Sequence, residues 1–140
     1  MGLERKIEVA AHAMSNITNM HVRMLTETKK LQGIEGPVTF YIGTSQHKNH
    51  DVLDMAKPSD YWFHVDSASS AHVVAVVPEG LQRKYLKYIV KQGALLCKQH
   101  TAKVAKQRDV TIMFTRAGNV RKTETPGLVS VSEVSSLITI

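Results

Sequence analysis

The stretch DYWFHVDSASSAHVVAVV, residues 60–77, decides the fold of this 140-residue chain. Two runs rich in aromatic and β-branched residues, 61–65 and 72–77, flank a serine-rich connection, which predicts two β-strands joined by a turn. The second run is almost continuously apolar, so we expect it at the centre of a sheet with both faces covered. We interpret Asp60 as the cap of the first strand and Trp62 as a large core anchor.

Further elements are predicted on both sides of this stretch. A heptad-like spacing of apolar residues predicts a long helix over residues 3–31, either a coiled-coil remnant, a dimerisation element or a helix lying on the sheet. A second long helix is expected over 81–99. The other expected elements are strands at 38–42, 110–115, 128–131 and 137–140, a short basic strand within 116–122 and a helical turn at 51–56.

The order of helix, strands, helix and strands predicts an α+β fold. We expect a mainly antiparallel sheet covered by the long N-terminal helix and by the second, basic helix. The domain division that follows is an N-terminal helix over 1–36 and a globular domain over 37–140.

Composition narrows the class of protein. The chain holds 18 Lys and Arg against 12 Asp and Glu, a formal charge of +6, and its one cysteine excludes an intrachain disulfide framework. A membrane-spanning helix needs an apolar run of about 18 residues, and the sequence contains none of that length. We therefore expect a cytoplasmic protein without a membrane partner.

The basic charge is concentrated in one segment. From Leu81 to Arg108 there are eight Lys or Arg residues and no Asp or Glu, which is what a phosphate-facing surface needs, although a plain solvated face stays open as an alternative. At helical spacing four lysines form a stripe, namely Lys84, Lys87, Lys91 and Lys98. The stripe is extended by Lys103, Lys106 and Arg108. A later basic strand forms a second patch with Arg116, Arg121 and Lys122.

Two other chemistries are open from the residues alone. His64, Asp66 and His72, beside Ser69 and Ser70, supply the side chains of a small hydrolase, but without the strained turn that usually presents a nucleophilic serine. Metal binding by pairs of residues three apart, His47 with His50 or Cys97 with His100, lacks the four ligands of a structural zinc site. We therefore predict no catalytic residue, no metal and no cofactor.

The ordered motifs YIGTSQHKNHDVL, DYWFHVDSASSAHVV, ALLCKQH and DVTIMFTRAGNVRKTETPGLV give the chain a family resemblance. From residue 37 onward it resembles the NFACT-R domain, which is found in NEMF, RqcH and fibronectin-binding-like proteins and alone in a eukaryotic coiled-coil branch. The match is strongest in Asp60, Trp62, Phe63 and His64, followed by Ser70, His72 and Val73. Bacterial-type members commonly carry Pro-Gly-Ser where this chain has Ser69-Ser70-Ala71, so the chain looks most similar to the stand-alone eukaryotic coiled-coil branch. It departs from that branch in ending at Ile140 before any following coiled coil.

The resemblance implies a non-catalytic RNA-binding module that takes part in translation or ribosome-associated quality control. The partners that it implies are tRNA or ribosomal RNA and, through them, the large ribosomal subunit. If the hairpin itself contacts RNA, His64 and His72 are the positions to probe. A rival interpretation is a protein-interaction module that forms a homodimer through residues 3–31.

Overall fold

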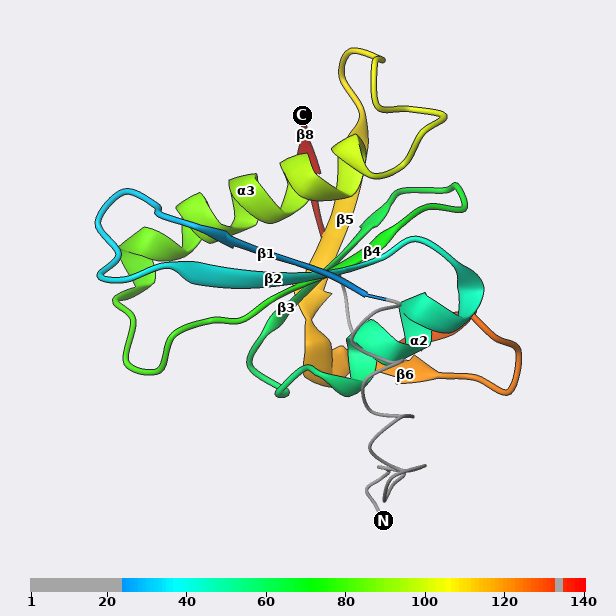
Figure 1. Cartoon of the computed structure of the whole chain (residues 1–140), viewed down its shortest axis with the longest axis horizontal. Coiled ribbons are helices and arrows are strands. Elements are labelled where there is room, and N and C mark those ends of the chain that lie inside the picture. The colour runs from blue at the N-terminus through cyan, green and yellow to red at the C-terminus, as the bar shows by residue number, and fades with distance from the viewer. Residues whose placement is uncertain (1–23, 133–134) are drawn as a thin grey trace.

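The computed structural model describes residues 24–132 and 135–140. Its main elements are the strands β1 (Leu25–Lys29), β2 (Val38–Gly43), β3 (Tyr61–Val65), β4 (His72–Ala75), β5 (Thr111–Arg116), β6 (Val120–Lys122), β7 (Val129–Val131) and β8 (Ser136–Thr139), and the helices α2 (Gln46–Asp54) and α3 (Leu86–Gln99). Short 3₁₀ turns occupy Arg83–Tyr85 and Ala117–Asn119. Figure 1 shows this arrangement.

One six-stranded sheet organises the fold, in the order β1-β2-β4-β3-β5-β8. Every neighbouring pair in it is antiparallel, and β6 and β7 form a separate two-stranded hairpin. The expectation of an α+β domain with a mainly antiparallel sheet is confirmed. The central position of the apolar run is confirmed as well, because β4 lies inside the sheet and all four of its residues are buried.

The prediction of a long helix over residues 3–31 is wrong for the C-terminal part of that range. Residues Leu25–Lys29 form β1, which pairs with β2 over five residues, from Leu25 opposite Ile42 to Lys29 opposite Val38. None of the β1 residues is fully buried, so a main-chain ladder and not an apolar pattern creates this strand. The rest of the predicted helix, and the dimer predicted through it, lies outside the described residues.

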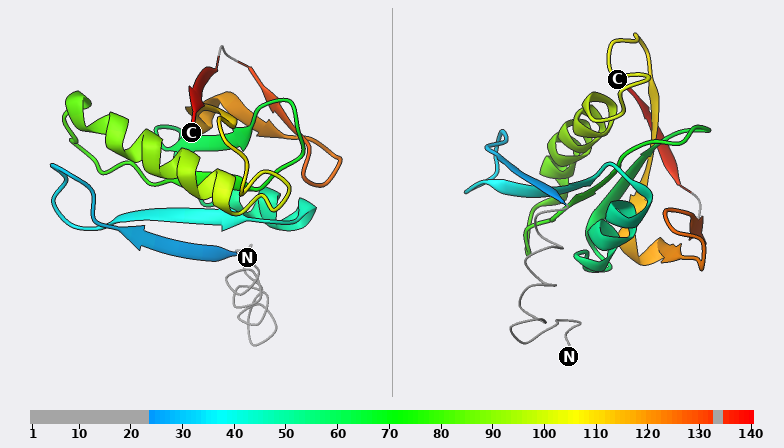
Figure 2. Two further views of the ribbon diagram at one scale, coloured as in Figure 1. Left: turned by 90° about the horizontal axis from the view of Figure 1, so that it is seen from above. Right: turned by 45° about the vertical axis from the view of Figure 1, so that its right-hand side comes forward.

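Alternation along the strands gives each sheet face its own core. Phe63 and Val65 of β3 point to the face covered by α3, whereas Trp62 points to the face covered by α2 and the β6–β7 hairpin. In Figure 1, α3 lies on one side of the strands while α2 and β6 lie on the other, and Figure 2 shows α3 from two further directions. A basic residue on α3 and a histidine that shares the face of Trp62 are therefore separated by the sheet.

Asp60 and Trp62 have the structural positions that we expected. The Asp60 carboxylate is fully buried and accepts hydrogen bonds from the main-chain N–H groups of Lys57 at 2.8 Å and Val77 at 2.9 Å. It thereby ties the start of β3 to the segment that follows β4. Trp62 is 1% exposed, in the core of the α2 face.

The approach of α3 to the sheet depends on Gly93. A Cβ at this position would lie 2.3 Å from two atoms of the Phe63 ring, so even alanine requires the helix or the ring to move. We expect Gly93→Ala to lower the free energy of unfolding by about 1–2 kcal/mol, since overpacking outweighs the gain in helix propensity. Urea unfolding followed by circular dichroism measures this change. Gln99→Ala, at an exposed position of the same helix, should stay within about 0.5 kcal/mol of the parent chain; equal effects would contradict the packing argument.

Candidate nucleic-acid interface

The outer side of α3 and the turn before it carry unpaired positive charge. Lys84, Lys87 and Lys91 are exposed, and among the described residues no carboxylate lies within ion-pair distance of them. Lys84 Nζ lies 5.2 Å from the ring centroid of Tyr85, and Lys87 Nζ lies 5.3 Å from that of Tyr88. Lys84 and Lys87 therefore rest on aromatic rings, and the ammonium groups of the three lysines stay available to an anion.

The stripe continues past the end of α3. Lys98 is half-buried and its Nζ donates to the main-chain oxygen of Ile140 at 3.3 Å. Lys103, Lys106 and Arg108 are exposed in the loop between α3 and β5. The residues predicted for the stripe thus follow one continuous segment, with Lys98 the member already engaged by the protein.

The second predicted patch does not form one surface. Arg116 lies with its guanidinium carbon 4.2 Å from the ring centroid of Tyr61 and donates to the carbonyl of Ser59. Lys122, on β6 at the α2 side of the sheet, forms an ion pair with Asp54 at 2.6 Å. Of the three patch residues, Arg121 alone is exposed and forms no ion pair with another described residue. Because Arg116 shares the sheet face of Tyr61, it is separated from the other two residues.

The two histidines meet on the sheet face opposite α3. Their ring centroids are 4.7 Å apart at an interplanar angle of 80°, and the ring of His64 stacks on Trp62 at 5.5 Å. The indole Nε1–H of Trp62 donates to Nδ1 of His72 at 3.2 Å, and the ring Nδ1 of His64 donates to the carbonyl of Val65 at 2.7 Å. Each ring thus has a fixed orientation, and the sheet separates the pair from the lysines of α3.

Both histidines are electrically neutral at pH 7. Burial, together with repulsion from His64 and His50, lowers the pKa of His72 from 6.5 to about 3. Burial also lowers the pKa of His64, and the nearby Lys103 acts in the same direction. A neutral, half-buried imidazole can stack on a flat ring and offers its free Nε2 as an acceptor.

The hydrolase arrangement is not assembled. Ser70 Oγ accepts from the N–H of Val65 at 2.9 Å and donates to the carbonyl of Ala71 at 2.8 Å, so it serves the turn. Among the described residues, neither serine hydroxyl bonds to a histidine ring, and Asp66 does not bond to His64. Burial raises the pKa of the Cys97 thiol to about 12, and its Sγ donates to the carbonyl of Ala71, which leaves it a poor nucleophile.

The residue pairs considered for metal binding do not converge either. His100 faces Glu27, with Nε2 and Oε2 3.2 Å apart, while Cys97 is buried. Within the part of the chain that the structure describes, no three His, Cys, Asp or Glu side chains could share an ion. In the same part no helix has the length and apolar character needed to cross a membrane.

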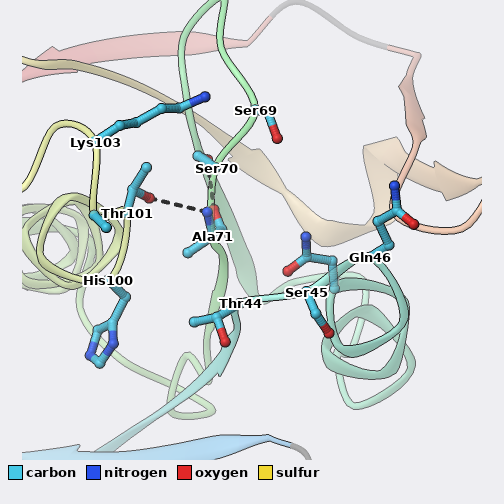
Figure 3. Close-up of a pocket in the computed structure, with 11 residues that line it drawn as sticks. Thr44, Ser45, Gln46, Ser69, Ser70, Ala71, His100, Thr101 and Lys103 are labelled. Atoms are coloured by element: carbon cyan, nitrogen blue, oxygen red, sulfur yellow. Dashed lines mark hydrogen bonds between the residues drawn. The ribbon is translucent and has the colours of Figure 1, made fainter.

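Two adjoining cavities form the site that sequence reasoning missed. The first, of about 580 Å³, is framed by the start of α2, the turn between β3 and β4, and the end of α3 with Lys103 (Figure 3). The second, of about 410 Å³, lies between the same turn, the two histidines and the loop 125–128. They share four lining residues, Gln46, Asn49, Ser69 and Ser70. No acidic side chain lines either cavity.

Close backbone contacts hold the walls of these cavities together. Gly127 has a φ of +82°, and a Cβ there would lie 2.8 Å from Cα of Gln46, so glycine lets the loop 125–128 approach α2. Nε2 of His50 lies 3.1 Å from the carbonyl of Leu128, which joins the same two elements. At the start of α2 the hydroxyl of Ser45 accepts from the N–H of Lys48. This capping serine, together with the glycines, was the signal in the sequence that could have located the site.

Comparison with known proteins identifies the family. The family described as NFACT protein RNA binding domain matches residues 24–133. The proteins named coiled-coil domain-containing protein 25 in Danio rerio and its homolog in Dictyostelium discoideum are 32% identical to this chain, over 91 and 84 residues. These matches cover 64% and 59% of this chain but only 44% and 41% of the relatives. The chain thus spans less than half the length of these curated relatives.

A solved structure shares the fold. The C-terminal part of the fibronectin/fibrinogen-binding protein from Streptococcus suis superimposes with a TM-score of 0.64 at 18% identity, covering 81% of this chain and 45% of that one. At this identity the likeness concerns the fold alone. It supports the overall fold described above.

Proposed function

Because the chain belongs to the family of NFACT RNA-binding domains, we propose that it binds structured RNA through the basic outer surface of α3 and the loop that follows. The proposed RNA is tRNA or ribosomal RNA, in translation or in ribosome-associated quality control on the large ribosomal subunit. The proposed role is binding without catalysis, in the cytoplasm. The family description supports the RNA, and the charge distribution supports the surface.

The observation that carries this proposal is the contrast between the basic groups. The lysines on α3 have no carboxylate partner among the described residues, whereas Lys122 is paired with Asp54 and Arg116 is bound to the chain itself. A phosphate that contacts an unpaired ammonium group displaces counterions and breaks no existing ion pair. The α3 surface is therefore the better of the two predicted basic surfaces for an RNA backbone.

Loss of two lysines from α3 should weaken binding and reduce its dependence on salt. Lys87 and Lys91 lie one helical turn apart and both are exposed. For Lys87→Gln with Lys91→Gln we expect the slope of log K against log salt to flatten by about 1.4 to 1.8, because each lost phosphate contact removes about 0.7 to 0.9. Affinity at 0.1 M salt should fall about fivefold to 50-fold. Fluorescence anisotropy with labelled, deacylated tRNA measures both quantities.

A matched control removes the same charge from the other side of the sheet. Arg121 and Lys122 are exposed on β6, and Arg121→Gln with Lys122→Gln should leave the slope within about 0.5 of the parent value. Equal flattening by both variants would mean that binding is not localised to α3. A slope that neither variant changes would contradict the proposed surface altogether.

A further inference from the structure

The cavity beside the histidines has the lining of a site for a flat ring. His64, Ala68, Pro126 and Leu128 supply its aromatic and apolar wall. The stack of His64 on Trp62 already fixes the orientation of the imidazole. An unpaired base stacks on aromatic side chains of this kind, whatever its identity, because every base has a π-face.

The adjoining cavity has the lining of a site for an anion. Figure 3 shows Lys103 extending along the Ser69–Ser70 turn, across the cavity from Ser45 and Gln46 at the start of α2. The first N–H groups of a helix have no partner within the helix and favour a negative charge. The lining combines these donors with an ammonium group, a serine hydroxyl and no carboxylate.

Asn49 connects the two cavities and has a free donor. Its side chain is 7% exposed and lines both cavities. Its Oδ1 accepts from the N–H of His72 at 3.3 Å, but its Nδ2 donates to no acceptor among the described residues. This donor is therefore available to an acceptor atom of a ligand that lies between the two cavities.

We propose that the two cavities together hold one unpaired nucleotide of the bound RNA, with its base beside His64 and its phosphate beside Lys103 and the start of α2. The inference rests on the proposed RNA binding and adds a site between the start of α2, the turn between β3 and β4, and the end of α3. The two volumes, about 410 and 580 Å³, lie in the range of small-molecule sites. A ligand with a flat ring at one end and a phosphate at the other matches both linings at once.

The decisive experiment compares two RNA hairpins with the same stem, one blunt and one with a single unpaired 3′ nucleotide. The parent chain should bind the second hairpin about fivefold to 100-fold more tightly, the range of one base stacked on an aromatic side chain. His64→Ala should remove this preference and His64→Phe should retain it, since phenylalanine preserves a ring at the same position. Gln46→Ala, at an exposed position of both linings, should reduce the preference without loss of folding.

The outcomes separate the two proposals. If the chain binds neither hairpin, the RNA-binding proposal fails. If it binds both equally, or if His64→Ala keeps the preference, RNA binding stands and the nucleotide site is overturned. NMR titration of the chain with 5′-AMP, adenosine, inorganic phosphate and a phosphoserine peptide completes the test. The chemical shifts of Gln46, Ser69 and His64 should change most with 5′-AMP. Equal chemical-shift changes with inorganic phosphate or with the peptide would overturn the proposal of a nucleotide site.

Discussion

Replacing Trp62 by alanine is expected to lower the free energy of unfolding by about 3–5 kcal/mol, the usual cost of truncating a buried tryptophan. The indole is 1% exposed and belongs to the core between the sheet and α2, with Val52, Val74 and Val120. Its Nε1–H is also the donor to Nδ1 of His72, so the substitution leaves a buried acceptor without a partner. Urea unfolding followed by circular dichroism measures the change.

Two further variants test the reason for this loss. Trp62→Phe keeps most of the apolar volume but loses the donor, so we expect a loss of about 1–2 kcal/mol in the free energy of unfolding. Leu137→Ala, at a residue that is 58% exposed, should stay within about 0.5 kcal/mol of the parent. A loss for Trp62→Ala no larger than that for Leu137→Ala would contradict the packing around Trp62.

Acidification should destabilise the chain through His72. The pKa of this group falls from 6.5 to about 3 on folding, so between these pH values the unfolded state binds a proton that the folded state does not. Stability therefore decreases as the pH falls, by about 2 kcal/mol between pH 7 and 5 and about 4 kcal/mol between pH 7 and 3.5. Below pH 3 this group adds no further loss. The lowered pKa of His64 acts in the same direction.

His72→Asn provides the control for this prediction. The asparagine amide oxygen can accept from Trp62 Nε1, as Nδ1 of His72 does, but the side chain does not titrate in this range. Urea unfolding between pH 7 and 4 should show a clearly shallower loss of stability for the variant than for the parent. Parallel pH profiles would mean that His72 is not the group whose protonation opposes folding.

The local pattern of residues predicted most of the sheet. The prediction for β3 agrees with the structure at both ends, and those for β2, β4, β5 and β7 deviate by two residues or fewer. In each of these segments aromatic or β-branched residues lie between turn residues, so sequence neighbours suffice to define the strand. The start of α2 was predicted less well, because its first turn is polar and its signal is the single capping residue Ser45.

β1 shows where local patterns fail. The spacing of apolar residues up to Leu31 fits a helix, and Leu25–Lys29 has no buried residue that would reveal a strand. Its hydrogen-bonded ladder with β2 decides the conformation of β1. The partners in that ladder lie far along the chain, as Leu25 with Ile42 shows. A periodicity read along one segment cannot include such a partner.

The candidate site divides in the same way. The sequence by itself determined the basic character of 81–108, because an absence of carboxylates is visible without coordinates, and it determined that α3 exposes lysines on one side. It also contained the capping serine and the two histidines beside the serine-rich turn. Those features are local, and side-chain chemistry and helical or strand periodicity follow directly from neighbouring residues.

Only the tertiary structure decided which of these groups share a surface. The sheet separates the histidines from the α3 lysines and Arg116 from Lys122, while Gly127 brings the loop 125–128 against Gln46 and completes a second cavity. Strand order and register create these relations, and both depend on pairings between residues far apart in the chain. The chemistry of each group is therefore local, but its position in a common site is a property of the fold.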